Sequence, residues 1–244
     1  MKEPQIIEFS TLPHECSYLK GRNCTMHYKY ILNCPSLLNS AMVERGWRRF
    51  GLYFSRPNCK ECKECVNLRI DAQNFRFSRS ARRVFKKNKN TQMFVCEPSL
   101  TRKHLELYEK YHKLMSAKKG WRYYELTPKN YFELHVAGCG KFGKEVLYFR
   151  DGKMIAVDLI DFTDDGISSI YFFYDPDFAW LSLGKYSIYQ QILLAQQQRL
   201  NWIYLGYYVK ECQSLAYKAE YKPYQLLQGN PETEEMPIWK NFNF

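Results

Sequence analysis

The chain of 244 residues has no run of about 18 apolar residues, so the sequence predicts no membrane-spanning segment. Residues 1–11 include acidic side chains and lack the apolar core that a secretory signal needs. These two absences predict a cytoplasmic protein with no membrane partner. In that compartment the nine cysteines are expected to be free, metal-bound or reactive rather than paired in disulfides.

Negative charge is also scarce, because 25 Asp and Glu stand against 36 Lys and Arg, which gives a formal net charge of +11. A charge of this sign favours a polyanionic partner, and nucleic acid before membrane. Apolar residues make up 45% of the chain, enough for a core, and the 20 tyrosines suit strand faces and binding clefts. The composition therefore predicts a globular protein that contacts nucleic acid.

The first part of the chain, residues 1–95, is expected to be an irregular, basic region that carries a cysteine motif. Cys59, Cys62 and Cys65 form two overlapping Cys-x2-Cys turns, and Cys16 is a candidate fourth ligand. Such turns can hold zinc or an iron–sulfur cluster. A matching downstream pair is missing, so this is not a zinc-ribbon pattern. A packed thiol cluster and redox-sensitive thiols are the alternatives.

A dense run of positive charge lies between Arg69 and Asn90, where eight Lys and Arg stand against a single acid, Asp71. Phe75, Phe77 and Phe85 are interleaved with these cations. Cations can bind phosphates while neighbouring rings pack or stack, so we expect contact with RNA or a nucleotide. The alternative is a solvated, charged surface.

Residues 96–244 are expected to form a second, α+β domain. The spacing of apolar residues predicts a helix over 100–119 that ends at Gly120, and Pro128 begins a short helix to about 136. The remaining predicted elements are three meandering strands with a hairpin at Asp151-Gly152, then helix, strand, helix and strand: 145–150, 153–162, 167–174, 183–199, 202–206, 211–221 and 223–228. The tail, with Glu232, Glu234 and Glu235, is expected to be loose.

The stretch 167–206 predicts a βαβ unit, whose crossover makes its two strands parallel. Ligands usually bind such a unit where the strands end and the helix begins. Ser182 and Gly184 open the helix, and the free N–H groups of its first turn can bind phosphate or carbonyl oxygens. Alternatively, Gly184 merely eases the entry of the chain into the helix. The glutamines between Gln190 and Gln198 are expected on its solvated face.

The order helix, helix, three antiparallel strands, helix, strand, helix, strand is that of the GNAT acyltransferase fold. In that fold a mixed sheet holds two parallel strands splayed apart, and an acyl donor and an amine meet between them. We therefore expect a GNAT-like catalytic domain preceded by the basic, Cys-containing region. Fold alone does not determine function.

The chain resembles the aminoacyl-tRNA–protein transferases, whose bacterial members are aspartate/glutamate leucyltransferases, over nearly its whole length. The N-terminal motifs that carry this resemblance are Cys16-x-Tyr18-Leu19-x-Gly21-Arg22, Gly46-x-Arg48-Arg49-x-Gly51, Arg56-Pro57-x-Cys59-x2-Cys62-x2-Cys65 and Phe75-x2-Ser78-Arg79-x2-Arg82-Arg83. The C-terminal motifs are Asp175-Pro176, Ser182-Leu183-Gly184, Tyr204-Leu205-Gly206-Tyr207 and Tyr217-Lys218-x3-Lys222-Pro223. Each motif is weak alone, and together they are specific.

The resemblance implies that leucine is transferred from Leu-tRNA to the α-amine of proteins with N-terminal Asp or Glu, which marks them for N-degron degradation. The partners would be aminoacyl-tRNA and these proteins, and transfer would require no cofactor because the ester is already activated. An arginyl-tRNA donor and a non-catalytic tRNA-binding module are alternatives. An acetyl-coenzyme A enzyme is disfavoured, because residues 179–184 hold one glycine and lack a pyrophosphate loop.

A weak base is sufficient for this reaction, because an α-amine has a pKa of about 7.7–8.0. The candidate catalytic residues are Asp158, Asp161, Tyr171 and Tyr207. Strand alternation places the two aspartates on opposite faces, so we expect one of them to face the cleft. The alternative for either is an exposed strand carboxylate.

A cation is needed to bind the side-chain carboxylate of the acceptor protein. The candidates are Arg22, Arg79, Lys218 and Lys222, although Lys218 could equally be a surface lysine that covers apolar area. Ser182 and Gly184 are expected near the ester. The tRNA acceptor end is expected to run over Arg79, Arg82, Arg83 and Lys86.

Overall fold

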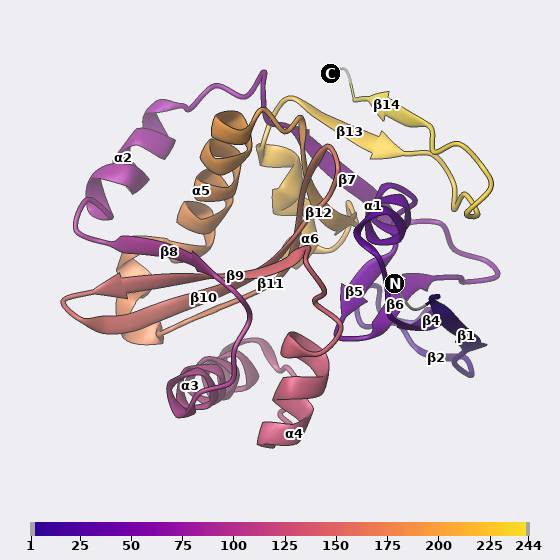
Figure 1. Ribbon diagram of the computed structural model, residues 1–244, viewed down its shortest axis with the longest axis horizontal. Coiled ribbons are helices and arrows are strands. Elements are labelled where there is room, and N and C mark those ends of the chain that lie inside the picture. The colour runs from indigo at the N-terminus through magenta and orange to yellow at the C-terminus, as the bar shows by residue number, and fades with distance from the viewer. Residues whose placement is uncertain (1–2, 243–244) are drawn as a thin grey trace.

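The chain folds around two β-sheets in the computed structural model, which describes residues 3–242 (Figure 1). The smaller sheet is antiparallel, with the order β1-β4-β6-β5. Its strands are β1 (Gln5–Ser10), β4 (Met26–Leu32), β5 (Arg48–Phe50) and β6 (Tyr53–Pro57). Helix α1 (Ser36–Glu44) packs on this sheet, and β2 (His14–Glu15) and β3 (Asn23–Cys24) form a separate two-stranded ribbon. The prediction of an irregular N-terminal region is therefore wrong.

The larger sheet is mixed and has eight strands in the order β14-β13-β7-β12-β11-β10-β9-β8. Its strands are β7 (Val66–Asp71), β8 (Gln92–Cys96), β9 (Gly143–Arg150), β10 (Lys153–Phe162), β11 (Gly166–Tyr174), β12 (Trp202–Tyr208), β13 (Tyr224–Leu227) and β14 (Trp239–Asn241). This α+β architecture agrees with the predicted fold class. The meander β9-β10-β11 and the Asp151-Gly152 hairpin are confirmed, and both hairpin residues have positive φ, at 49° and 75°.

Strand β7 comes from the N-terminal part of the chain but lies inside the larger sheet, between β12 and β13. It pairs with both neighbours in antiparallel fashion, and Leu68 and Ile70 on it are fully buried. The boundary between domains 1–95 and 96–244 stays a prediction, although residues from before it belong to the core of this sheet.

Strands β11 and β12 are parallel, as the βαβ pattern predicts, but they pair over three positions, from Gly166–Trp202 to Ser168–Tyr204. Strand β11 continues to Tyr174 and β12 to Tyr208. The two strands therefore separate beyond Ser168 and Tyr204. We call the space between their separated ends the splay.

Helices cover both faces of the larger sheet (Figure 1). Their bounds are α2 (Arg79–Lys87) and α5 (Leu183–Gln198) on one face, α3 (Arg102–Lys119) and α4 (Pro128–Tyr131) on the other, and α6 (Gln213–Ala216) after β12. A π-helical turn (Phe132–Val136) extends α4, and 3₁₀ turns precede α5 (Pro176–Leu181) and follow α6 (Tyr217–Glu220). Thr101 caps α3 and Gly120 ends it in a left-handed conformation, as predicted for Gly120. Among residues 3–242 there is no helix long and apolar enough to cross a membrane.

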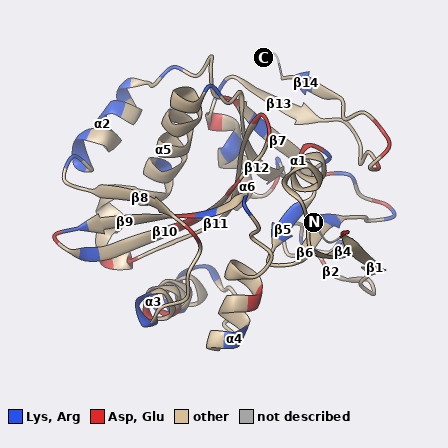
Figure 2. Cartoon of the chain, viewed as in Figure 1, with Lys and Arg blue, Asp and Glu red and all other residues tan. Residues whose placement is uncertain are grey.

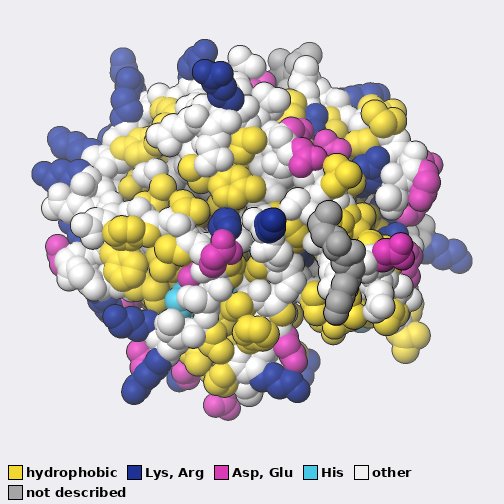
Figure 3. All heavy atoms as spheres, viewed as in Figure 1, with side chains coloured by type: hydrophobic (Ala, Val, Ile, Leu, Met, Phe, Trp, Pro, Cys, Tyr) yellow, Lys and Arg dark blue, Asp and Glu magenta, His cyan; other side chains and the backbone are white. Residues whose placement is uncertain are grey.

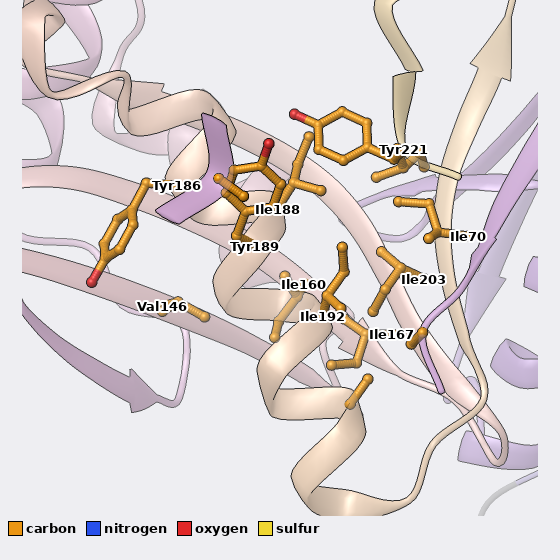
Figure 4. Close-up of a cluster of buried hydrophobic side chains, with 14 of the residues drawn as sticks. Ile70, Val146, Ile160, Ile167, Tyr186, Ile188, Tyr189, Ile192, Ile203 and Tyr221 are labelled. Atoms are coloured by element: carbon orange, nitrogen blue, oxygen red, sulfur yellow. The ribbon is translucent and has the colours of Figure 1, made fainter. Parts of the chain in front are cut away.

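Helix α5 lies on the sheet through buried isoleucines and tyrosines (Figure 4). Ile192 of α5 meets Ile160, Ile167 and Ile203 of the sheet, and all four are at most 1% exposed. The glutamines of this helix are only partly on its solvated face: Gln191 is 1% exposed and donates to Asp158. The prediction that these glutamines form a solvated face is therefore wrong at Gln191.

The C-terminal tail is attached to the body of the protein. Strand β14 pairs with β13, and Glu232 accepts a hydrogen bond from Arg56. Arg45 donates to the backbone carbonyls of Glu232 and Glu235, at 3.0 Å each. The prediction of a loose tail is therefore wrong, because Arg45 and Arg56 of the N-terminal part bind it.

Candidate active site

Arg48 lies across the splay. From β5 its Nη2 donates to the backbone carbonyls of Ser169, at 2.5 Å, and Ile170, at 3.2 Å, both beyond the last β11 residue that pairs with β12. On the β12 side it lies against Gly206, where an added Cβ would be 2.6 Å from Nε of Arg48. Arg48 belongs to one of the family motifs, although its sequence context predicted no role for it. In the structure it donates to carbonyls of the part of β11 that does not pair with β12.

Lys218 does the same for β12. Its side chain is 9% exposed, and its Nζ donates to the carbonyls of Leu205, at 2.8 Å, and Tyr207, at 2.7 Å. Both carbonyls follow Tyr204, where the pairing with β11 ends. Burial, and then the charge of Arg48, lower the pKa of Lys218 to about 7. The alternative of a surface lysine is therefore excluded, and binding of the acceptor's carboxylate by Lys218 stays a prediction.

Asp158 is fully buried on the α5 face of β10, with no exposed area. One carboxylate oxygen, Oδ2, accepts hydrogen bonds from Ser187 and from Nε2 of Gln191, the latter at 2.8 Å. Within residues 3–242, the other oxygen, Oδ1, has no hydrogen-bond partner. Burial raises the pKa of Asp158 to about 7, and the two hydrogen bonds partly oppose that rise. Asp158 is thus a buried carboxyl group with one unpaired oxygen and a pKa near 7, a shift of the kind found at catalytic sites.

Asp161 points to the opposite face and is held by Arg49. The guanidinium donates two hydrogen bonds to the carboxylate, from Nε to Oδ2 and from Nη2 to Oδ1, both at 2.6 Å. Asp161 has no exposed area and Arg49 is 3% exposed, so this is a buried, bidentate ion pair. The two aspartates thus lie on opposite faces, as strand alternation predicts, and neither is an exposed strand carboxylate.

The two candidate tyrosines both use their hydroxyl groups in hydrogen bonds. Tyr207 donates to the carbonyl of Ser55, at 2.9 Å. Tyr171 lies 2.6 Å from Nε2 of His112, whose Nδ1 is 2.7 Å from the carbonyl of Tyr108. A carbonyl can only accept, so Nδ1 carries the ring proton and Tyr171 donates to Nε2. Burial lowers the pKa of His112 and raises those of both tyrosines, which keeps all three groups neutral.

The start of α5 lies close to the splay and to the basic helix α2. Ser182 is left-handed, with φ 58° and ψ 44°, and its carbonyl accepts from the N–H groups of Lys185 and Tyr186. A Cβ at Gly184 would meet Phe172 at 3.8 Å, an ordinary contact distance. Packing therefore does not require glycine at position 184, so easy packing alone does not explain it.

The four candidate cations of helix α2, Arg79, Arg82, Arg83 and Lys86, are all exposed. Lys and Arg make up much of this helix in Figure 2. The interleaved rings are not available for stacking on bases. Phe77 and Phe85 pack against Tyr189 of α5, each with its ring centroid 5.8 Å from the tyrosine ring. The basic run is thus a helix with a charged outer face and an apolar inner face, and it lies beside α5 of the βαβ unit (Figure 1). Lys and Arg side chains project from the surface at the upper left of Figure 3, where α2 lies.

Arg22 lies beside the cysteines, at the rim of a cavity of about 480 Å³. Its Nη1 is 3.4 Å from Sγ of Cys62, and the cavity is also lined by Lys60 and Glu61. Arg22, Arg79 and Lys222 are exposed, and they lie on different segments of the chain: the loop before β3, α2 and the loop before β13. Three of the four predicted carboxylate-binding cations are thus exposed, and the fourth, Lys218, is buried.

The cysteine cluster has a fifth member, Cys24, which the Cys-x2-Cys spacing does not reveal. Burial is the first cause that raises the pKa of Cys24 to about 12, and the thiols of Cys59, Cys16 and Cys62 add to it. Burial and the same group of thiols raise the pKa of Cys65 to about 12. In the described part of the chain, no three Cys, His, Asp or Glu side chains are placed to hold a metal ion. Cys16, Cys24, Cys59, Cys62 and Cys65 are thus five thiols in one neighbourhood.

Comparison with known proteins identifies the family. The family model for the C terminus of arginine-tRNA-protein transferase matches residues 103–228, and that for its N terminus matches residues 14–83. The aspartate/glutamate leucyltransferase of Campylobacter jejuni is 50% identical over 96% of this chain and 98% of its own length. That of Helicobacter hepaticus is 37% identical over 98% of this chain and 99% of its own.

Among solved structures, the C-terminal domain of a putative lysylphosphatidylglycerol synthetase from Agrobacterium fabrum covers 61% of this chain and 48% of its own. Its sequence identity is 12% and its TM-score is 0.45, which is a distant likeness. The near full-length matches to the two leucyltransferases, together with the matches of both family models, show that the chain belongs to the arginine-tRNA-protein transferase family.

Proposed function

We propose that this protein transfers leucine from Leu-tRNA to the α-amine of proteins that begin with Asp or Glu. The observation that supports this most strongly is the near full-length similarity to aspartate/glutamate leucyltransferases. The splay supports it independently, because a buried carboxylate with a raised pKa stands beside two strands that separate. We expect the reaction to take place in the cytoplasm, with Leu-tRNA and the acceptor protein as partners.

We further propose that the larger sheet is a GNAT-like acyltransferase domain. Its support is the element order together with the parallel pair β11–β12, which separates after three paired positions. In such a domain the acyl donor and the amine enter between the separated strands. Here Arg48 and Lys218 bind the edges of β11 and β12 that face the splay. The reactants would therefore meet farther along the splay, beside the start of α5.

In the proposed reaction the acceptor's amine nitrogen attacks the ester carbonyl carbon of Leu-tRNA. An amide bond forms, the ester C–O bond breaks, and the terminal ribose hydroxyl of the tRNA leaves with a proton. We assign the base to Asp158, whose Oδ1 is free to accept the amine proton while Ser187 and Gln191 hold Oδ2. Alignment of amine and ester supplies much of the rate enhancement, because the ester is already activated.

Asp161, Tyr171 and Tyr207 are weaker candidates for the base. The carboxylate of Asp161 is bound by Arg49, and the two hydroxyls donate to His112 and Ser55. Each of these groups would first have to give up an existing partner. We assign them to the positioning of strands and helices around the splay.

We propose that Arg22 or Lys222 binds the side-chain carboxylate of the acceptor. Both are exposed, unlike Lys218, and Arg22 lines a cavity with Lys60. Arg79 shares α2 with Arg82, Arg83 and Lys86, which favours contact with tRNA phosphates for the whole group. Ser182 and Gly184 remain our candidates for contact with the ester.

Zinc or an iron–sulfur cluster at Cys16, Cys59, Cys62 and Cys65 stays a proposal, to which we add Cys24. The proximity of five thiols supports it, but the thiols would have to lose their protons and converge. Metal analysis and the absorption spectrum of anaerobically purified protein test it. Metal or cluster content that is absent from both the wild type and a Cys24→Ala variant would reject it. The transfer itself requires no cofactor.

The deciding experiment supplies Leu-tRNA or Arg-tRNA, labelled in the amino acid, with peptides that begin with Asp, Glu, Lys or Arg. Label from Leu-tRNA on Asp and Glu peptides alone supports the proposal. Label from Arg-tRNA on the same peptides retains the class and changes the donor, which the family description also accommodates. Label on Lys and Arg peptides rejects the acidic acceptor. Bound tRNA without transfer leaves a non-catalytic binding module.

A further inference from the structure

The loop that follows α3 exposes rings and cations together. Over residues 118–124 the sequence reads Lys-Lys-Gly-Trp-Arg-Tyr-Tyr. Trp121 is 40% exposed, Tyr123 36% and Tyr124 64%, and Lys118, Lys119 and Arg122 are exposed as well. The guanidinium of Arg122 lies 4.9 Å from the ring centre of Tyr124. Each of these rings therefore offers part of its surface to solvent, and Tyr124 offers the most.

The loop 118–124 exposes rings together with cations, whereas the basic helix α2 exposes cations alone. The rings of α2 are packed against α5, so that helix offers charges alone, which suits the phosphates of a duplex. The loop 118–124 offers flat apolar surfaces with cations between them, which suits unpaired bases and their phosphates. Two acids also lie nearby: Glu125 follows the loop, and Glu109 accepts a hydrogen bond from Tyr123 at 3.4 Å. Three cations outnumber them.

The loop adjoins the proposed site through a continuous series of rings. The ring of Trp121 is 6.3 Å from those of Tyr111 and His112. Tyr111 in turn is 5.2 Å from Tyr174, the last residue of β11. Burial, and then the phenols of Tyr174 and Tyr217, raise the pKa of Tyr111, so Tyr217 is also near. Tyr217 in turn lies close enough to Arg48, which crosses the splay, for that charge to act on its pKa. A strand of nucleic acid on the loop would thus end close to the splay.

We propose that Trp121, Tyr123 and Tyr124 form the stacking surface for the single-stranded 3′ end of the tRNA, with Lys118, Lys119 and Arg122 binding its phosphates. The inference rests on the proposed function, since it names the part of the donor that this surface binds. Unpaired bases lie at the aminoacylated end of tRNA, and a stacking surface next to the splay would orient the ester toward it.

The test compares binding of intact tRNA with binding of the same tRNA trimmed of its last four, unpaired nucleotides, by fluorescence anisotropy. We expect the wild type to bind intact tRNA at least tenfold more tightly than trimmed tRNA. The Trp121→Ala/Tyr124→Ala variant is expected to lose about tenfold in affinity for intact tRNA, the change produced by ~1.4 kcal/mol of stacking. Its affinity for trimmed tRNA should equal that of the wild type.

Two matched variants separate stacking from other effects. Trp121→Phe/Tyr124→Phe keeps flat rings and should bind intact tRNA nearly as the wild type does. Phe94→Ala removes a ring that is 49% exposed on edge strand β8 and should change neither affinity. Equal binding of intact and trimmed tRNA by the wild type overturns the inference. The inference is also overturned if the alanine variant raises the KM for the acceptor peptide while its affinity for tRNA stays unchanged, because the rings would then contact the acceptor.

Transfer of leucine to an Asp-initiated peptide by the wild type is measured in parallel. A wild type that transfers leucine but does not distinguish the two tRNAs retains the proposed function and overturns the stacking surface. A wild type that prefers intact tRNA through these rings but transfers nothing retains the surface and overturns the catalytic proposal.

Discussion

The guanidinium of Arg48 lies directly against the α-carbon of Gly206, where a β-carbon would be 2.6 Å from Nε and 2.7 Å from Cζ. Gly206 also has a φ of 73°, in the region that side chains disfavour. The glycine of the Tyr-Leu-Gly-Tyr motif is thus explained by the cation that crosses the splay. A side chain at position 206 would fill the space that Arg48 occupies and would disturb the hydrogen bonds that Arg48 makes to β11.

Gly206→Ala is therefore expected to destabilise the protein by about 3 kcal/mol, the combined cost of the left-handed backbone and of displacing Arg48. Gly229→Ala is the matched control, because Gly229 has a φ of 69° and no atom within 4 Å of an added Cβ. It should lose about 1 kcal/mol. Urea unfolding measures both. Equal losses at the two positions would show that contact with Arg48 carries no cost.

Asp158→Asn should reduce the rate of leucyl transfer by about 10² to 10⁴, the usual contribution of a general base. In the wild type the rate should rise with pH through about 7, as Asp158 loses its proton. The variant should lose that rise and keep its affinity for tRNA. A variant that transfers leucine at the wild-type rate would remove Asp158 from catalysis.

The same carboxyl group makes folding stability depend on pH. Between about pH 4 and pH 7 the folded state retains a proton on Asp158 that the unfolded chain has released, so stability falls as pH rises through this window. The loss is on the order of 4 kcal/mol. Subtracting the unfolding free energy of Asp158→Asn from that of the wild type at each pH isolates this contribution. A difference that does not vary between pH 4 and 7 contradicts the raised pKa.

Local patterns predicted the parts of the fold that short segments determine. The Asp151-Gly152 turn, the end of α3 at Gly120 and the crossover between β11 and β12 depend on residues close together in the sequence, and all three are present. Strand β7 could not be placed in this way, because its neighbours β12 and β13 come more than a hundred residues later. Gln191 looked like surface, and its partner Asp158 is identified only when the helix is packed on the sheet.

The sequence likewise predicted some residues of the candidate site but not the partners that distinguish them. The sequence pointed to Asp158 and Asp161 alike as candidate bases. Strand alternation places the two carboxylates on opposite faces of β10, but it does not show which side chains pack on each face. The choice depends on Arg49, which comes from a different sheet. Arg48 was part of a quoted motif, so its signal was present, whereas nothing in the sequence singled out His112. Cys24 escaped notice because it lies outside the Cys-x2-Cys turns.

Asp161→Asn should act on stability rather than on chemistry. It leaves Arg49 buried without its charge partner, which typically costs about 3–5 kcal/mol. Transfer per folded molecule, measured at a temperature where the variant remains folded, should stay within a few-fold of the wild type. An unfolding midpoint that is unchanged, together with a hundredfold slower transfer, would instead make Asp161 the catalytic carboxylate.

Arg82→Ala/Arg83→Ala should weaken tRNA binding and reduce its dependence on salt. In duplex DNA each phosphate contact adds about 0.9 to the slope of log affinity against log salt concentration, so two lost contacts should lower the slope by between about 1 and 2. Helix α2 should survive, because alanine favours helix and both side chains are exposed. Lys103→Ala/Lys129→Ala removes the same charge from exposed sites on α3 and α4, across the sheet from α2, and should leave the slope unchanged. Equal slopes for both double variants would mean that tRNA responds to net charge and that α2 is not its binding surface.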